Sequence, residues 1–306
     1  DIKCSANRSG TLHCAHSQNG LKDIQKRYQQ LSTRGAELEL LDKQQTNQRI
    51  GSSKFFGALF NKSAGTINPL SYCIGLALAA QSKGANIYET TLATKIQSIN
   101  GHWLIKTTEG SIEAKMLLIA TNAYQQPIKG IKSPEYTSVH YFQVATNPLP
   151  KKDTKMILPN GEGCWDTASV MSSFRLDEDN RLIIGGVGNL GHGASKIHTN
   201  WARRKIKSLF PNLKNIPIEY NWHGRIAMTA NHIPKIQKLG NNAFSVFGFS
   251  GRGIGPGTYF GKAVVESLLS GDENSLPVTP MSQNKEHFRS IKSKLFELGA
   301  TASHLL

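Results

Sequence analysis

A glycine-rich turn near the C-terminal end of the sequence has the residue types best suited to contact a ligand. It runs from Gly248 to Thr258 and contains five glycines. The apolar run 243–247 precedes it and apolar residues at helical spacing follow it, so we expect a turn between a buried strand and a helix. Glycine lets the backbone approach a flat ligand closely, and free N–H groups at a helix start favour an electron-rich ring or a phosphate. The alternative is a turn whose glycines only let the helix pack tightly on a sheet.

This turn differs from the usual dinucleotide-binding fingerprint. The Gly-x-Gly-x-x-Gly fingerprint opens a βαβ unit and is followed by an acidic residue roughly 20 positions later. Here the turn lies near the C-terminus, and no second strand is expected close behind it. The turn alone therefore indicates a ligand contact without identifying the ligand.

Four other segments become informative when they are taken in their order along the chain. They are Gly65-Thr66-Ile67-Asn68-Pro69, Leu117-Leu118-Ile119-Ala120-Thr121-Asn122-Ala123-Tyr124, Arg181-Leu182-Ile183-Ile184-Gly185-Gly186 and Trp222-His223-Gly224-Arg225. With residues 246–253, they resemble the FAD-dependent D-amino acid oxidase/glycine oxidase superfamily, nearest to amine oxidoreductases similar to gamma-glutamylputrescine oxidase. The resemblance spans nearly the whole chain and depends on the order of the segments.

The resemblance implies FAD as the cofactor and a mixed α/β fold. In that fold an incomplete Rossmann-like FAD-binding domain is interleaved with an antiparallel substrate sheet. We expect a substrate-side segment at 1–66, FAD-binding segments at 67–130 and 238–306 (the latter with a C-terminal helix), and the antiparallel substrate domain at 131–237.

The start of the chain departs from the family pattern. Family members begin with a strand, Gly-x-Gly-x-x-Gly and a helix, which together hold the FAD pyrophosphate. Nothing of that kind occurs before residue 60, and the chain starts at Asp1. We therefore expect that the N-terminal pyrophosphate-binding part is missing here, and that a missing segment or a separate chain completes the FAD site.

The cofactor contacts that the resemblance implies come from two segments. Ligands of open α/β sheets lie at the carboxyl ends of the strands. Ala120, Thr121 and Asn122 end the expected strand 115–121, although Asn122 could simply start a turn. The glycine-rich turn supplies the other expected contacts, which are Gly248, Ser250, Gly251, Arg252, Gly253, Ile254, Gly255 and Thr258.

The substrate contacts are expected on the sheet side. By resemblance, Tyr141 would form an apolar wall, while Trp222 and its neighbour His223 would lie by the substrate. Trp222 could offer a cation–π face to an ammonium group, and Arg225 could pair with a carboxylate through two hydrogen bonds. Arg252 would lie over the ring edge or bind a carboxylate. The alternatives are a core aromatic for Trp222, a surface salt bridge for Arg225 and a solvent-exposed Arg252.

The implied reaction oxidises the C–N bond of an amine or amino acid, with hydride passing to the flavin and an imine as product. No carboxylate pair has a spacing that demands general acid–base catalysis, and no Gly-x-Ser-x-Gly nucleophile elbow occurs. The alternative function is a non-catalytic basic remnant or binding module that does not hold flavin. Polyamine derivatives, glycine-like amines and D-amino acids all stay open as substrates, as does oxygen against another electron acceptor.

The charge of the chain argues against specific nucleic-acid binding. The formal net charge is +15, and the densest basic runs lie at 151–152, 203–207 and 289–294. The last two fall on expected amphipathic helices, where such charges normally face solvent, and no DNA- or RNA-binding motif surrounds them. A more acidic missing part would explain the excess of positive charge.

The cysteine and hydropathy patterns limit which metal sites, redox sites and cellular locations we expect. The four cysteines form no Cys-x-x-Cys pair, so we expect no zinc site or redox dithiol, and free thiols fit a cytoplasmic location. His13 and His16 would lie on opposite faces of a strand, which disfavours a shared metal. No run of about 18 apolar residues occurs, so we expect no membrane span, and we see no signal peptide.

Periodicity and turn residues predict alternating helices and strands. Strands are expected at 10–16, 38–41, 85–89, 94–99, 103–107, 111–114, 115–121, 136–147, 165–174, 181–187, 220–228 and 243–247, and the segment 55–60 is expected to face the substrate. Helices are expected at 20–34, after an Asp42 cap, at 70–82 after an Asn68 cap with Pro69 next, at 201–209, at 259–269 and at 282–304.

Overall fold

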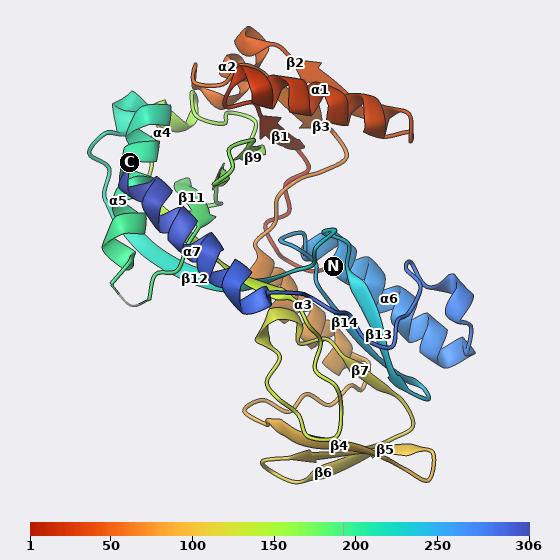
Figure 1. Cartoon of the computed structure of the whole chain (residues 1–306). Coiled ribbons are helices and arrows are strands. Elements are labelled where there is room, and N and C mark those ends of the chain that lie inside the picture. The colour runs from red at the N-terminus through yellow and green to blue at the C-terminus, as the bar shows by residue number, and fades with distance from the viewer. Residues whose placement is uncertain (192) are drawn as a thin grey trace. The chain divides into compact units, whose positions relative to one another are not determined.

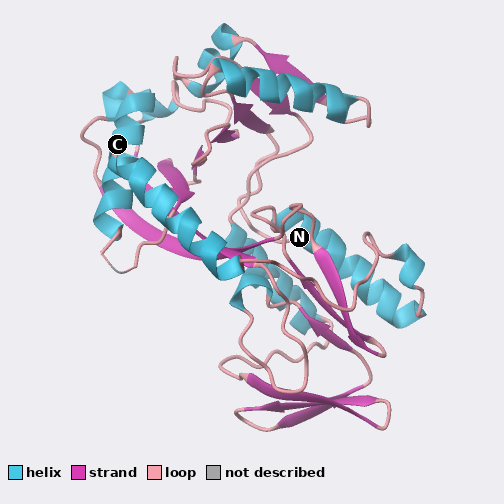
Figure 2. Cartoon of the chain, viewed as in Figure 1, coloured by secondary structure: helices cyan, strands magenta, loops and turns pink. Residues whose placement is uncertain are grey.

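The structure, a computed structural model, describes residues 1–191 and 193–306. Internal contacts divide these residues into two compact units. Unit 1 comprises Asp1–Ala85, Tyr141–Gly224 and Glu297–Leu306, and unit 2 comprises Asn86–His140 and Arg225–Phe296. Figure 1 traces the order of the elements, and Figure 2 marks which of them are helices and which are strands. The domain boundaries expected from the sequence, which are 1–66, 67–130, 131–237 and 238–306, stay a prediction.

The main sheet has eight strands. In spatial order they are β12 (Ile218–Met228), β8 (Thr137–Pro148), β11 (Arg181–Val187), β10 (Ser172–Leu176), β9 (Gly163–Asp166), β1 (Thr11–Cys14), β3 (Ala58–Asn61) and β2 (Leu38–Leu41). β1 and β9 run parallel, whereas the β8–β11, β11–β10, β10–β9, β1–β3 and β3–β2 pairs are antiparallel. The strands expected around 10–16, 38–41, 136–147 and 181–187 are therefore confirmed.

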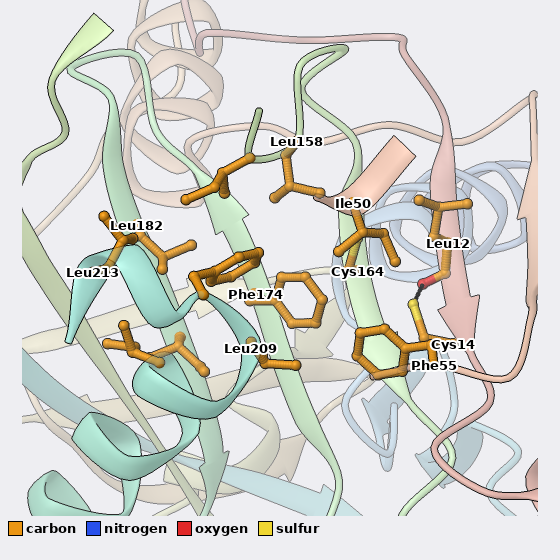
Figure 3. Packing of buried hydrophobic residues seen from close by; sticks show 14 of the residues in the cluster. Leu12, Cys14, Ile50, Phe55, Leu158, Cys164, Phe174, Leu182, Leu209 and Leu213 are labelled. Atoms are coloured by element: carbon orange, nitrogen blue, oxygen red, sulfur yellow. Dashed lines mark hydrogen bonds between the residues drawn. The ribbon is translucent and has the colours of Figure 1, made fainter. Parts of the chain in front are cut away.

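The largest hydrophobic core lies against one face of this sheet. Helix α5 (Ser195–Leu209) buries Ala202, Ile206 and Leu209 there. Figure 3 shows members of the cluster packed together, among them Phe174 and Leu182 from the sheet. The Cys14 thiol in this cluster donates to its own strand, at 3.6 Å from the carbonyl oxygen of Leu12. The core thus fixes which side of each strand faces away from it.

Unit 2 contains two three-stranded sheets. One has the order β13 (Lys235–Gly240), β14 (Ala243–Phe247), β7 (Leu117–Ile119), with β14 and β7 parallel. The other is the expected meander of β4 (Ala93–Ile99), β5 (His102–Thr107) and β6 (Ser111–Ala114). Helix α6 (Ile254–Ser270) packs Phe260 and Val264 in one cluster with Val246 of β14. The indole of Trp103 donates to the Asn241 carbonyl oxygen at 2.9 Å.

Two of the remaining helical segments begin at caps that were expected from the sequence. The remaining helices are α1 (Gln18–Ser32), α2 (Lys43–Ile50), α3 (Pro69–Ser82), α4 (Lys151–Thr154) and α7 (Arg289–Leu305), with short 3-10 turns η1 (Asn122–Tyr124), η2 (Pro211–Leu213) and η3 (Glu273–Ser275). Asp42 caps α2 in a reciprocal capping box with Gln45. Asn68 caps α3, with Pro69 at its first position.

Two of the strands predicted from the sequence are wrong. Residues 85–89 form no strand, and Ile87 and Tyr88 are 43% and 66% exposed, so no neighbour covers their apolar pattern. Residues 165–174 form two strands, because the Asp166 carboxylate accepts hydrogen bonds from the N–H groups of Ala168 and Ser172 and so reverses the chain between β9 and β10.

The last expected helix begins later than its apolar spacing predicted. Residues 282–288 are outside α7, and Phe288 has a φ of +57°, which an α-helix does not contain. The apolar run 115–121 also yields a strand of three residues only, β7. Lys115 and Met116 before it and Ala120 and Thr121 after it are exposed, which corrects the expectation of a fully buried run.

Candidate functional site

The glycine-rich turn joins β14 to α6 in unit 2, as expected from the sequence. All five residues of β14 are buried, so the strand gives the turn a fixed base. Gly248, Ser250 and Gly251 have φ values of +81°, +51° and +84°. These left-handed conformations turn the chain sharply out of the strand, and glycine adopts them without a steric cost. The sequence spacing therefore predicted both the place and the nature of the turn.

Asn122 lies directly beside the start of this turn. Its side-chain Oδ1 accepts a hydrogen bond from the Gly248 N–H at 3.0 Å. The contact follows from topology, because β7 and β14 are parallel and their carboxyl ends meet at one edge. Ala120 and Thr121 are exposed at the same strand end, and the Thr121 hydroxyl bonds to the side chain of Gln125.

The hydroxyl and backbone of Ser250 tie the turn to the end of β12. The Ser250 N–H donates to the Ala227 carbonyl oxygen at 3.0 Å, and its Oγ accepts from the Thr229 N–H at 3.3 Å. The same hydroxyl donates to the Gly248 carbonyl oxygen at 3.2 Å. Ser250 therefore holds the shape of the turn with its backbone N–H and its hydroxyl.

The face of the turn that leads into α6 is open. Residues 251–256 are exposed, and a Cβ atom added at Gly253, Gly255 or Gly257 would have no other atom within 4 Å. Among the described residues no side chain caps α6, so the N–H groups of Ile254 and Gly255 keep the free capacity of a helix start. Thr258 Oγ1 donates back to the Ile254 carbonyl oxygen at 2.9 Å. This edge can accept a flat, electron-rich group close to the backbone.

Two arginines of the sequence-predicted set, Arg225 and Arg252, belong to unit 2. The Arg225 N–H donates to the Tyr124 hydroxyl at 3.0 Å, and its guanidinium lies 4.7 Å from the centre of the Tyr124 ring. Burial raises the pKa of the Tyr136 hydroxyl, and the positive charges of Arg225 and Arg289 act in the opposite direction. Arg252 is exposed and has no hydrogen bond or ion pair from its side chain within the described chain.

Tyr141 and Trp222 belong to unit 1, whereas the glycine-rich turn belongs to unit 2. The Tyr141 hydroxyl lies 2.8 Å from Ser173 Oγ, and burial raises its pKa to about 12. Trp222 is 44% exposed, which excludes the alternative of a core aromatic within its unit. His223 beside it is exposed too.

Some residues that build the site were not predicted from the sequence. Tyr124 was part of a recognised segment, yet only the structure shows that it supports Arg225. Thr229 had no local signal, although its methyl group would lie 2.5 Å from a Cβ on Gly248. Such contacts between separate segments leave no periodic pattern in a sequence.

A second glycine pattern, Gly186-x-Gly188-x-x-Gly191, serves packing in unit 1. A Cβ on Gly186 would lie 3.0 Å from the Trp201 ring, and one on Gly188 would lie 2.6 Å from the His198 ring. The pattern follows the antiparallel strand β11, whereas a pyrophosphate turn needs a βαβ unit. Gly186 and Gly188 therefore leave room for side chains of α5, and the pattern does not fit a pyrophosphate-binding turn.

Within residues 1–191 and 193–306, no three His, Cys, Asp or Glu side chains are grouped so that they could hold a metal ion. No helix in the same described ranges has the length and apolar character that crossing a bilayer requires.

A family model and several known proteins match this chain. The model described as DAO, FAD dependent oxidoreductase, matches residues 1–267. The probable oxidoreductase OrdL of Haemophilus influenzae is 30% identical over 241 residues, which cover 77% of this chain and 55% of that protein. The gamma-glutamylputrescine oxidoreductase of Escherichia coli K12 is 28% identical over 271 residues, which cover 87% of this chain and 62% of that protein. The chain thus spans less than two thirds of the length of either relative.

Solved structures share the fold at lower identity. The glycine oxidase of Geobacillus kaustophilus has a TM-score of 0.77 at 18% identity, covering 93% of this chain and 77% of that one. The L-proline dehydrogenase of P. horikoshii also has a TM-score of 0.77, at 21% identity, covering 90% and 75% of the two chains. These likenesses confirm the expected mixed α/β fold class. Because the family model matches most of its length, this chain belongs to the DAO family of FAD-dependent oxidoreductases, whose members bind FAD.

Proposed function

We propose that this chain is part of an FAD-dependent oxidoreductase that oxidises the C–N bond of an amine or amino acid. The observation that supports it best is the hydrogen bond from Gly248 to Asn122, beside an open, uncapped helix start. The names of two relatives support the substrate class, since one is a gamma-glutamylputrescine oxidoreductase and another, 24% identical, is a glycine oxidase. When bound, FAD would accept the hydride that leaves the substrate carbon.

In this proposal the chain holds the flavin through backbone atoms. The exposed stretch from Gly251 to Gly255 leaves room for a ring against the backbone, and the start of α6 favours negative charge there. Asn122 and Ser250 would act mainly by fixing the turn, because their oxygen atoms already bond to it. The whole set is Ala120, Thr121, Asn122, Gly248, Ser250, Gly251, Arg252, Gly253, Ile254, Gly255 and Thr258.

The proposed substrate contacts divide between charge and shape. Arg225 and Arg252 are exposed cations that would attract and orient a carboxylate or lie at the ring edge. Tyr141, with a pKa raised to about 12, stays a neutral phenol at neutral pH and would form an apolar wall. Trp222 would offer its ring face to a substrate ammonium group.

We also propose that a dinucleotide-binding segment outside residues 1–306, on the same polypeptide or a separate chain, holds the FAD pyrophosphate. Helix α3 supports this, because it has no buried residue and is rich in apolar side chains. Leu70, Ile74 and Leu78 are 69%, 51% and 60% exposed. Apolar surface of this kind normally marks a contact face.

An absorbance scan tests the function. We expect the purified protein to show a flavin spectrum or to gain one when FAD is added, and its melting temperature to rise with FAD. Under anaerobic conditions, polyamine derivatives, glycine-like amines and D-amino acids are then added in turn, and one class should bleach the flavin band. Colourless protein with no gain in melting temperature would support the non-catalytic binding module instead.

The four cysteines form no disulfide, which is consistent with the cytoplasm, and we propose the cytoplasm as the location of the protein.

A further inference from the structure

A cavity of about 150 Å³ opens on the main sheet of unit 1, well above the roughly 10–15 Å³ that one water molecule needs. Side chains from β1, β8, β9, β10, β11 and the loop before α3 line it. Those that the argument uses are Thr11, Thr66, Gln143, Trp165, Arg175 and Ile183. The cavity therefore combines a cation, several neutral polar groups and an apolar wall.

The cation is the guanidinium of Arg175 on β10. The side chain is half-buried, and within residues 1–191 and 193–306 it makes no hydrogen bond or ion pair. Burial lowers the pKa of Arg175, and the charge of Asp177 opposes that effect. The Asp177 carboxylate itself accepts from the Arg181 N–H at 2.7 Å. A guanidinium has five N–H donors, and leaving them unpaired in a partly desolvated place is costly.

Other polar side chains in the cavity also lack partners. No hydrogen bond of the side chains of Gln143, Thr66 or Thr11 is found in the part of the chain that the structure describes. Thr11 is only 9% exposed. Buried and half-buried polar groups are normally paired, so unpaired ones that meet in one cavity indicate a ligand.

The sheet register creates the space between these groups. Gly185 on β11 pairs with Gln143 on one side and Ser173 on the other. A Cβ at Gly185 would lie 2.8 Å from Gln143 Cγ and 2.9 Å from a ring carbon of Tyr141. Ser173 and Arg175 share one face of β10, as Tyr141 and Gln143 share one face of β8. The glycine thus keeps the middle of that face clear.

The apolar part of the lining is made by Trp165 and Ile183. Trp165 is held by a stacked contact with His13, with ring centres 5.2 Å apart. Ile183 is 7% exposed and pairs directly with Arg175 across β10 and β11. A ligand with a short hydrocarbon chain next to an anionic group matches this arrangement.

We propose that this cavity binds a small aliphatic carboxylate, with Arg175 and Gln143 holding the carboxylate oxygens and Trp165 and Ile183 contacting the chain. A planar carboxylate accepts two parallel hydrogen bonds from a guanidinium, which a neutral amide cannot replace. None of these residues is among the proposed flavin contacts, so the proposal can be tested without flavin.

Calorimetric titration of the full chain with butanoate, and with butanamide as the neutral isostere, tests the proposal. We expect saturable binding of butanoate and at least about tenfold weaker binding of butanamide, because a charge-assisted pair is lost. Arg175→Gln should weaken butanoate at least about tenfold, and Arg175→Lys should lie between it and the parent. Arg34→Gln, which removes an equal charge from an exposed site on the same unit, should bind as the parent does.

Gln143→Glu is a second variant, which separates a loss of binding from a loss of folding. It supplies Arg175 with a carboxylate of the protein's own, so the fold should keep its melting temperature while butanoate binding is lost. Equal binding of butanoate and butanamide, no saturable binding of butanoate, or unchanged binding by folded Arg175→Gln or Gln143→Glu protein would each overturn the proposal.

Discussion

The side-chain oxygen of Asn122 holds the backbone N–H of Gly248, 126 residues away in the sequence, at 3.0 Å. Both residues have positive φ, +46° and +81°, so each lies at a point where the chain leaves its strand and turns. The bond links the two segments on which the proposed flavin site depends. Because Gly248 has a single backbone donor, the loss of this hydrogen bond should be measurable.

Asn122→Ala should lower the free energy of unfolding by about 1–3 kcal/mol, because the Gly248 N–H is left without an acceptor in a buried place. Asn122→Asp keeps an oxygen at the same position and tolerates positive φ, so it should retain most of the stability. Urea unfolding of the three proteins measures the difference. Equal losses for the two variants would show that the oxygen acceptor is not what matters.

Gly248→Ala should be costly for two reasons. Its φ of +81° is unfavourable for alanine, and the added Cβ would lie 2.5 Å from Thr229 Cγ2. Left-handed backbone costs about 1–2 kcal/mol and overpacking about 1–3 kcal/mol, so we expect a loss of at least about 2 kcal/mol.

Gly253→Ala is the matched control within the same turn. Gly253 has a φ of −80° and open space around it, so the change in stability should stay within about 0.5 kcal/mol. Urea unfolding again provides the comparison. A loss at Gly253 as large as that at Gly248 would mean that the turn is rigid throughout and not open as described.

Much of the fold could be predicted because local rules determine it. Asp42 and Asn68 cap helices where their side-chain chemistry predicts, and β14 is buried along its full length as its apolar run indicates. The failures occur where contacts distant in sequence decide. Residues 85–89 have the pattern of a strand but pair with no strand that the structure describes, and Asp166 reverses the chain by binding the backbone of Ser172.

The candidate site was only partly predictable for the same reason. Glycine spacing located the turn, and the strand-end rule located Asn122. Thr229 and Tyr124 support the turn and Arg225 through single contacts that no spacing encodes. The unpaired guanidinium of Arg175 was not foreseen either, because the sequence does not show which arginine lacks a partner.

A buried histidine pair gives unit 1 a defined response to pH. Nδ1 of His198 lies 2.8 Å from Nδ1 of His304, and Trp201 stacks on His304 with ring centres 4.1 Å apart. Burial, followed by the charges of His198, Arg204 and Lys205, lowers the pKa of His304 to about 3. Burial also lowers the pKa of His198, which the nearby carboxylate of Glu297 partly opposes.

The sign follows from proton counts. Between the unfolded pKa of about 6.5 and the folded value of about 3, the unfolded chain binds more protons, so stability falls as pH falls through that window. We expect the melting temperature to drop between pH 7.5 and 5, and His304→Gln to reduce that drop. His287→Gln, at an exposed position, is the control and should leave the drop unchanged. Parallel pH curves for the parent and His304→Gln would contradict the assignment.

The central claim is that the backbone from Gly248 to the start of α6 holds a flavin ring. Gly255→Gln places a long side chain into the open space at the helix start, where no other atom lies within 4 Å of the added Cβ. It should not lower stability, since glutamine favours a helix more than glycine does. Gly299→Gln, at an exposed helical glycine of α7 with equally open space, is the matched control.

The most direct measurement is a titration of FAD into these three proteins, followed by the change in flavin absorbance and fluorescence. We predict that the parent and Gly299→Gln bind FAD equally and that folded Gly255→Gln binds it at least about tenfold more weakly, because the ring can no longer reach the backbone. Equal FAD affinity for Gly255→Gln and the parent, or no FAD binding by the parent, would contradict the claim.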